Sequence, residues 1–243
     1  MIPPGIDWGG VIDATWPAAR TRQLGPWTIR EGAGGGNRVS ATTARDTVSP
    51  GDVRAAARAM QDLGQEVVFA VRPGDPGSDA VLADLGYRVR DETVIYACPS
   101  ATLASPAPPP VTAFAVWPPL ACQREIWEAG GIGPARLAVM DRAAGAKTTI
   151  LGRTQDRPAG TLFVACHGTV AMLHALEIAQ AHRRRGLGAQ LTRAAARWAA
   201  LAGGETFSLL TTVANTRARA LYEGLGMVEV GRYHYRAIPQ EQP

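Results

Sequence analysis

Three consecutive arginines and two glycines, in the segment Arg183–Gly188 (RRRGLG), form a pattern suited to binding an anion. The apolar run 170–178 before it is typical of a buried strand, and apolar residues recur at helical spacing from Leu187 to Leu201. The glycines therefore lie where a strand turns into a helix, where backbone N–H groups lack internal partners and the helix dipole is positive. Glycine lets a phosphate approach the backbone, and guanidinium groups bind it in a bidentate way. The segment predicts a phosphate site; the alternative is a solvated basic turn that begins a helix.

A second segment, Asn215–Gly226 (NTRARALYEGLG), directly follows a strand-like run at 207–213. Asn215 is a favoured N-cap residue, and Gly226 is suited to end a helix. Ala218 and Leu221 lie on one helical face, with Tyr222 beside it. We therefore expect a short helix that begins at Asn215 and carries a phenol near its apolar face.

The order strand, RRRGLG, helix, strand, NTRARALYEGLGM resembles the GNAT superfamily of acetyl-CoA-dependent N-acetyltransferases. The pyrophosphate-binding signature of that superfamily, Q/R-x-x-G-x-G/A, is matched by Arg183, Gly186 and Gly188. A later helix commonly carries an N…A…LY…LGF pattern, matched here by Asn215, Ala218, Leu221, Tyr222, Leu225 and Gly226. Met227 replaces the usual aromatic residue. The resemblance covers roughly residues 112–243 and implies transfer of an acetyl group from acetyl-CoA to a primary amine.

The resemblance also implies which residues bind the coenzyme. The phosphate-binding segment would comprise Arg183, Arg184, Arg185, Gly186, Leu187, Gly188 and Ala189, with one or two of the arginines on the phosphates and the rest solvated. In this superfamily the preceding strand splays from its neighbour and offers backbone N–H groups to the acetyl and pantetheine moieties. These positions map onto Glu177, Ile178 and Ala179, with the Ile178 N–H as the oxyanion donor. Asn215 and Ala218, at the start of the second helix, are expected along the pantetheine arm.

Attack of an amine on a thioester needs a base, because a lysine-like amine has a pKa of about 10.4, and an acid for the departing thiolate. The resemblance implies that Tyr222 is the acid; the alternative is a tyrosine that only packs on the sheet. The base is open among His174, Glu177 and an ordered water. His174 and Glu177 are three residues apart, so a regular strand places them on opposite faces unless a bulge intervenes. A buried structural histidine is the alternative for His174.

Composition limits the class of protein. The 243 residues are 46% hydrophobic and 19% charged, as in a soluble globular protein. No apolar run reaches about 18 residues, and the first residues lack the basic and apolar regions of a secretory signal. Three widely spaced cysteines, Cys98, Cys122 and Cys166, argue against a disulfide framework or a zinc site. We therefore expect a cytoplasmic protein with no metal and no membrane partner.

Charge is unevenly distributed along the chain. Residues 1–111 carry 10 Arg and 12 Asp plus Glu, whereas residues 112–243 carry 15 Lys plus Arg and 9 Asp plus Glu. A basic second half that holds the predicted phosphate loop fits an anionic cofactor. Because no recognition-helix pattern or aromatic–basic interleaving accompanies the charge, we expect no nucleic-acid partner.

An internal repeat predicts two domains. The string RAAAR occurs at 54–58 and again at 193–197, an offset of 139, and Leu85–Tyr87 (LGY) corresponds to Leu225–Met227 (LGM) at an offset of 140. In each copy an alanine-rich helix, an apolar strand, a short helix and a final strand follow in the same order. Residues 99–111, rich in Pro, Ala and Ser, are typical of an extended linker. We therefore predict a mixed α/β (α+β-like) protein with two tandem GNAT-type domains, 1–98 and 112–243, each a twisted, mostly antiparallel sheet flanked by helices.

The first copy is expected to be degenerate. The positions equivalent to Arg185, the two loop glycines, Asn215 and Tyr222 hold, in that order, Asp46, Thr47, Ser49, Asp75 and Leu82. Such a copy has no phosphate loop and no acid, so its expected uses are packing on the active copy, walling the substrate cleft or forming a homodimer. The glycine-rich segment 32–37 is expected to be a flexible hairpin turn between 27–30 and 38–40.

The acceptor amine stays open on the sequence alone. The resemblance places acceptor-binding residues in 126–140 and 233–236, where the candidates are Trp127, Glu128, Arg136, Tyr233 and Arg236. A small amine, an amino acid, an antibiotic and a protein N-terminus all fit. The alternative function is a module that binds an acyl-CoA or a partner without turnover.

Overall fold

The first part of the chain forms a small sheet and two strands of a larger one. The structure, a computed structural model, describes residues 1–75 and 77–239. The small sheet is antiparallel, in the order β1-β2-β3. The elements of this part are α1 (Trp8–Thr15), β1 (Arg20–Leu24), β2 (Trp27–Glu31), α2 (Asn37–Ser40), β3 (Thr43–Ala44), α3 (Pro50–Asp62), β4 (Val68–Val71), α4 (Ser78–Asp84), β5 (Arg88–Pro99) and α5 (Ser100–Leu103).

The second part supplies the other strands of the large sheet. Its elements are β6 (Ala113–Val116), α6 (Ala121–Ala129), α7 (Pro134–Arg142), β7 (Lys147–Thr154), β8 (Arg157–His167), β9 (Val170–Ile178), the 3-10 turn η1 (Gln180–His182), α8 (Leu187–Leu201), β10 (Thr206–Thr212), α9 (Thr216–Gly224) and β11 (Val228–Ala237). Helix α8 packs on the sheet through the apolar face that its periodicity predicts, with Leu187, Leu191 and Ala195 buried. Leu201, at its last turn, is exposed.

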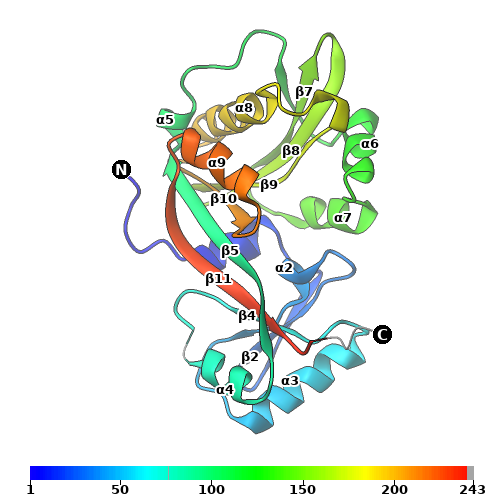
Figure 1. Ribbon diagram of the computed structural model, residues 1–243, viewed down its shortest axis with the longest axis vertical. Helices are drawn as coiled ribbons and strands as arrows, with labels where there is room; N and C mark the ends of the chain where they lie inside the picture. Colours follow the sequence, from blue (N-terminus) through cyan, green and yellow to red (C-terminus); the bar gives the residue numbers. More distant parts are fainter. Residues whose placement is uncertain (76, 240–243) are drawn as a thin grey trace.

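The large sheet has the order β4-β11-β5-β10-β9-β8-β7-β6. All its pairings are antiparallel except that between β9 and β10. Helices α8 and α9 lie in the upper half of Figure 1, and α3 and α4 lie at the lower end. The structure therefore confirms a mixed α/β class with a large sheet flanked by helices.

The middle of this sheet is built from both halves of the chain. Strand β5 lies between β10 and β11, and β11 lies between β4 and β5. Figure 1 shows β5 and β11 side by side along the length of the molecule. The successions α3-β4-α4-β5 and α8-β10-α9-β11 thus occupy reciprocal places, and each inserts its last strand into the other's part of the sheet. The sequence predicted a separate sheet in each half, but the structure shows one large sheet that both halves share. The division of the sequence at 98 and 112 stays a prediction.

Two predicted irregular segments are more ordered than expected. Residues 100–103 of the predicted linker are helical, and buried Leu103 packs in the core with α8. The Arg193 side chain of α8 also donates to the carbonyls of Leu103 and Ser105. The glycine-rich segment 32–36 leads into α2, so the strand expected at 38–40 is wrong and the hairpin is instead β1–β2. Among the described residues, no helix is long and apolar enough to cross a membrane.

Candidate active site

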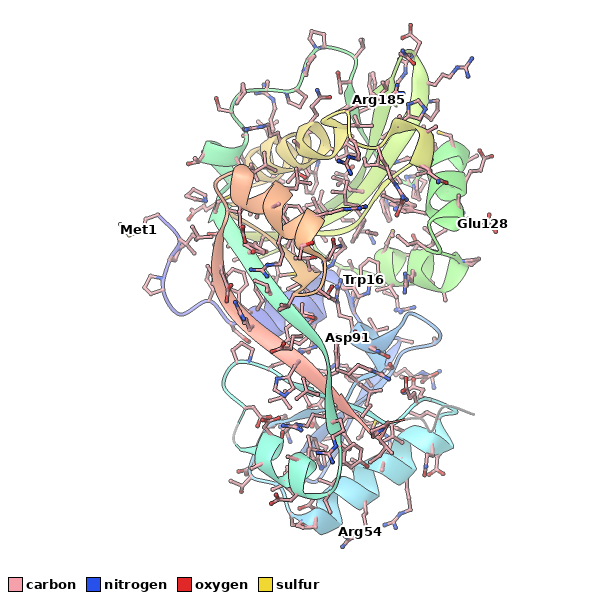
Figure 2. All side chains as sticks on the ribbon, viewed as in Figure 1. Met1, Trp16, Arg54, Asp91, Glu128 and Arg185 are labelled. Carbon is pink, nitrogen blue, oxygen red and sulfur yellow. The ribbon has the colours of Figure 1, made fainter. Side chains whose placement is uncertain are left out.

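A cavity of about 990 Å³ opens between the two halves of the chain. From the first half it is lined by Trp16, the loop before α2, and the segment around Asp91; Figure 2 places Trp16 near the centre of the molecule. From the second half it is lined by the end of β9, the arginine loop and α9. The predicted site residues that line it are His174, Glu177, Ile178, Arg183, Arg184, Gly186, Leu187, Gly188, Ala189, Asn215, Ala218 and Tyr222.

The cavity exists because β9 and β10 diverge. Their parallel pairing ends at Leu173 and Leu209, although β9 continues to Ile178 and β10 to Thr212. On the other edge of β9 the Ala179 N–H donates to the Ala159 carbonyl at 2.9 Å, and Gly160 pairs with Ile178. Because N–H groups alternate in direction along an antiparallel strand, the Ile178 N–H points away from β8, into the gap beside β10.

Strand β9 carries a bulge at this point. Phe163 pairs with His174 and Thr161 pairs with Glu177, so β9 advances by three residues over the length in which β8 advances by two. Ala175 takes a positive φ of 53°, and its carbonyl accepts a hydrogen bond from the Trp127 indole at 2.7 Å. The extra residue brings His174 and Glu177 onto the same face of the sheet. Trp127 is 0% exposed and supports the bulge from the core, so it does not line the cavity, in contrast to its expected place in the acceptor pocket.

The start of α8 has unpaired backbone donors. Gly186 is the N-cap, with a φ of 78° and no side-chain cap, and the first intrahelical bond runs from the Gln190 N–H to the Gly186 carbonyl. The N–H groups of Leu187, Gly188 and Ala189 thus have no helical partner. All three residues line the cavity. The arrangement is suited to an anion.

The three arginines of the loop have different surroundings. Arg183 donates from Nη2 to Glu177 Oε1 at 2.9 Å and from Nε to the Ile178 carbonyl at 2.8 Å, so it ties the loop to β9. Arg184 lines the cavity, whereas Arg185, labelled in the upper part of Figure 2, does not. Ala179 does not line it either, and its N–H is already used by β8. The structure therefore does not support coenzyme contacts by Arg185 or Ala179.

Glu177 reaches the cavity beside Gly130, which follows α6. A Cβ atom on Gly130 would lie 2.7 Å from Glu177 Oε2, so glycine leaves the space that the carboxylate occupies. The side chain of Glu177 is 18% exposed and pairs with Arg183. The Glu177 carboxyl group therefore faces the cavity on the same side as His174.

Tyr222 is buried in α9 and lines the cavity. Asn215 caps this helix as predicted, its Oδ1 accepting from the Ala218 N–H at 3.1 Å. Burial raises the pKa of the Tyr222 phenol to about 12, so the hydroxyl keeps its proton at neutral pH. None of the described residues hydrogen-bonds this hydroxyl, which leaves the proton available to a ligand in the cavity.

His174 is held as a neutral, buried residue. Arg38 has only donors, so His174 Nδ1 must accept from Arg38 Nη1 at 3.1 Å. Nε2 then carries the proton and donates to Thr15 Oγ1 at 2.9 Å, and Thr15 donates to the Val11 carbonyl at 2.7 Å. Burial first, and then the charge of Arg38, lower the pKa of His174 well below 6.5. Both ring nitrogens are occupied, so the geometry favours the structural alternative over a catalytic base.

We expect His174 to make the protein less stable in acid. Its pKa is depressed in the folded state, so below 6.5 the unfolded chain binds a proton that the folded chain does not. The stability is fully present above the unfolded pKa and is lost as pH falls from there toward the folded pKa, at up to about 1.4 kcal/mol per pH unit.

Urea unfolding of the wild type and of His174→Gln between about pH 8 and about pH 5 measures this loss. Glutamine keeps one donor and one acceptor but does not titrate, so the variant should lose less stability over that range. Equal slopes for the two proteins would show that His174 is protonated in the folded state.

The first half of the chain contributes cavity residues that the sequence did not indicate. They are Trp16, Gly35, Gly36, Asn37, Arg38, Asp91 and Thr93. Of the acceptor-site candidates, Arg136 and Tyr233 line the cavity, whereas Glu128 does not and points outward in Figure 2. Arg236 instead donates to Asp79 at 2.5 Å and, with His234, lowers the pKa of Asp79 to about 2. The available sequence signal for this part of the cavity was the run of glycines at 34–36, just before Asn37 and Arg38. From the sequence these glycines predicted only a hairpin turn.

Residues 120–227 match the model of the acetyltransferase (GNAT) family. The uncharacterized N-acetyltransferase YobR of Bacillus subtilis (strain 168) is 26% identical over 238 residues, which span 92% of this chain and 94% of that protein.

Two solved structures are similar over nearly the whole chain. A GCN5-related N-acetyltransferase from Kribbella flavida is 20% identical with a TM-score of 0.73, covering 96% of this chain and 94% of that one. A tandem GNAT protein from the clavulanic acid biosynthesis pathway is 16% identical with a TM-score of 0.60, covering 97% and 88%. At these sequence identities, the structural similarity shows only that this chain shares the fold of the two proteins.

Proposed function

We propose that the protein transfers an acetyl group from acetyl-CoA to a primary amine by direct attack, because residues 120–227 match the model of the acetyltransferase (GNAT) family. One observation carries the proposal. The free N–H groups at the start of α8, the Ile178 N–H turned into the gap beside β10, and the protonated Tyr222 hydroxyl all belong to one cavity. Transfer from a thioester needs an anion-binding site, an oxyanion donor and an acid.

The residues at the start of α8 fit the diphosphate of coenzyme A. The helix has no side-chain cap, and Gly188 leaves open space toward the cavity beside Leu221, whose Cδ2 lies 3.4 Å from the position of a Cβ atom. Arg184, at the same rim, adds a cation. Asn215 and Ala218, at the start of α9, line the same cavity as Ile178.

Each group would act on a defined atom. When bound, acetyl-CoA supplies the reactive acetyl thioester. The Ile178 N–H donates to the acetyl carbonyl oxygen, where negative charge develops. Tyr222 donates its proton to the departing sulfur, and Glu177, directly or through a water, receives the proton that the amine loses. His174 is left out of the reaction, because Arg38 and Thr15 occupy its nitrogens.

We also propose that residues 1–98 are a degenerate copy of the acetyltransferase fold. The nearly constant sequence offset and the reciprocal places of α3-β4-α4-β5 and α8-β10-α9-β11 support this. The start of α3 differs from that of α8 in a way that excludes an anion. Ser49 Oγ accepts from the Asp52 N–H at 3.2 Å, and Asp52 Oδ2 accepts from the Ser49 N–H at 2.9 Å. The Asp52 N–H is thus used, Pro50 has no N–H, and a carboxylate occupies the position.

The proposal predicts one acetyl-CoA site per chain and amine-dependent release of free coenzyme A. Calorimetric titration measures the stoichiometry, and a thiol reagent follows the release across a panel of amines. Two molecules bound per chain would contradict the degenerate copy. Binding without transfer to any amine would identify a module that holds acyl-CoA, and absence of binding would overturn the cofactor assignment.

A further inference from the structure

Arg38 faces the cavity without an acidic partner. It is the second residue of α2, its guanidinium carbon lies 6.0 Å from the centroid of the Trp16 ring, and Nη1 contacts neutral His174. Its Nε is buried and has no hydrogen-bond partner. Among residues 1–75 and 77–239 no carboxylate oxygen lies within 4.0 Å of it, whereas the nearby Arg30 and Arg72 both pair with Asp13. A half-buried guanidinium group that has no carboxylate partner favours the binding of an anionic ligand.

The backbone around Arg38 is built to bring a second guanidinium close. Gly36 has a φ of 89°, and a Cβ atom there would lie 3.6 Å from Arg136 Nη2. At Gly35 a Cβ atom would lie 2.7 Å from the side chains of both Val39 and Val139, so only glycine lets the loop pass between α2 and α7. Arg136 also lines the cavity, and in the described chain it has no acidic partner within 4.0 Å. Two unpaired guanidinium groups therefore flank one part of the cavity wall.

The part of the cavity wall that holds Arg38 and Arg136 lies a short distance from Glu177 and Ile178, which the proposed reaction uses. Arg38 contacts His174, and the bulge places Glu177 on the same face of the sheet two β8 positions away. Two strand residues span about 7 Å. One small molecule is therefore able to place an anionic group at Arg38 and an amine near Glu177 and the Ile178 N–H.

We propose that the acceptor amine carries a carboxylate, as a free amino acid does, and that Arg38 binds this carboxylate with Arg136 beside it. The inference rests on the proposed acetyl transfer and names its substrate class. An amine without a nearby anion, such as the N-terminus of a protein chain or a simple alkylamine, would leave the half-buried Arg38 guanidinium without an anionic partner in the complex, which is costly.

The test compares free amino acids with their C-terminal amides as acceptors, at saturating acetyl-CoA. Each pair has the same side chain and the same reacting amine and differs in the carboxylate. We expect kcat/KM to be roughly 10- to 30-fold higher for the amino acid than for its amide, because a charge-assisted pair is lost in the amide.

Arg38→Met isolates the contribution of the guanidinium. This variant should abolish the preference: through a higher KM, kcat/KM for the amino acid should fall much more than kcat/KM for the amide. Arg54→Met is the matched control: Arg54 is exposed on α3 at the lower end of Figure 2, far from the cavity, so this variant should behave as the wild type. Arg38→Lys, which keeps the charge and loses the planar fork, should retain part of the preference.

The outcomes separate this inference from the proposed function. Equal transfer to amino acids and amides by the wild type overturns the carboxylate site and leaves acetyl transfer standing. The same follows if Arg38→Met lowers transfer to both acceptors equally, since a purely structural role predicts that result. Acetyl-CoA binding without transfer to any acceptor contradicts both.

Discussion

Replacing Tyr222 by phenylalanine is expected to lower kcat for acetyl transfer by at least about 100-fold, the range over which general acids contribute. The phenol lines the cavity, is 6% exposed, and has a pKa that burial raises to about 12. It therefore holds a proton at neutral pH and is able to donate it as the thiolate departs. Phenylalanine keeps the ring and removes the acid, so the affinity for acetyl-CoA should change little. Steady-state kinetics and calorimetry on the two proteins separate the two effects.

Tyr96→Phe provides the matched control. The ring of Tyr96 lies 6.2 Å from that of Tyr222, but its hydroxyl hydrogen-bonds Glu223 at 2.5 Å and Arg219 at 3.3 Å, and it does not line the cavity. This variant should keep the wild-type kcat. The raised pKa of Tyr222 also predicts that its ionisation does not reduce the wild-type kcat below about pH 11. A Tyr222→Phe protein with normal kcat would mean that the thiolate leaves without an acid from α9.

Gly188→Glu is expected to weaken acetyl-CoA binding by at least about 100-fold without destabilising the fold, because the new carboxylate would occupy the place where the phosphates bind. Gly188 is the second residue of α8 and has no positive φ. A side chain there meets Leu221 at an ordinary contact distance of 3.4 Å. Glutamate also suits a helix better than glycine, and an acid in the first turn stabilises the helix dipole. Calorimetric titration measures the affinity, and thermal unfolding measures the stability.

The neutral variant Gly188→Gln separates charge from bulk. Glutamine has nearly the shape of glutamate but does not repel a phosphate, so its loss of affinity should be clearly smaller. Identical losses in the two variants would mean that the side chain acts by filling space. An unchanged affinity in Gly188→Glu would place the coenzyme elsewhere, because a carboxylate at the start of α8 cannot coexist with a bound diphosphate at low cost.

The sequence by itself determined the elements around the coenzyme site. The apolar run 170–178, the glycines at 186 and 188 and the cap at Asn215 act through their immediate neighbours along the chain. Strand and helix periodicity, a glycine that adopts positive φ and an N-cap hydrogen bond are all local. The strand, loop and helices therefore lie where the pattern predicts, and Tyr222, Gly188 and Ile178 line the same cavity.

Only the tertiary structure decided how the two halves combine. A strand pattern states which residues alternate but not which edge they pair with, so the exchange of β5 and β11 was not predictable. The bulge at Ala175 was equally unpredictable, because it depends on a hydrogen bond from Trp127 of α6. So was the neutral form of His174, because it depends on contacts with Arg38 and Thr15. Arg38 belongs to the first half of the chain, which was expected to be inactive because it has no phosphate loop and no acid. Its position in the cavity follows from contacts between residues more than a hundred positions apart in the sequence, and local patterns carry no information about them.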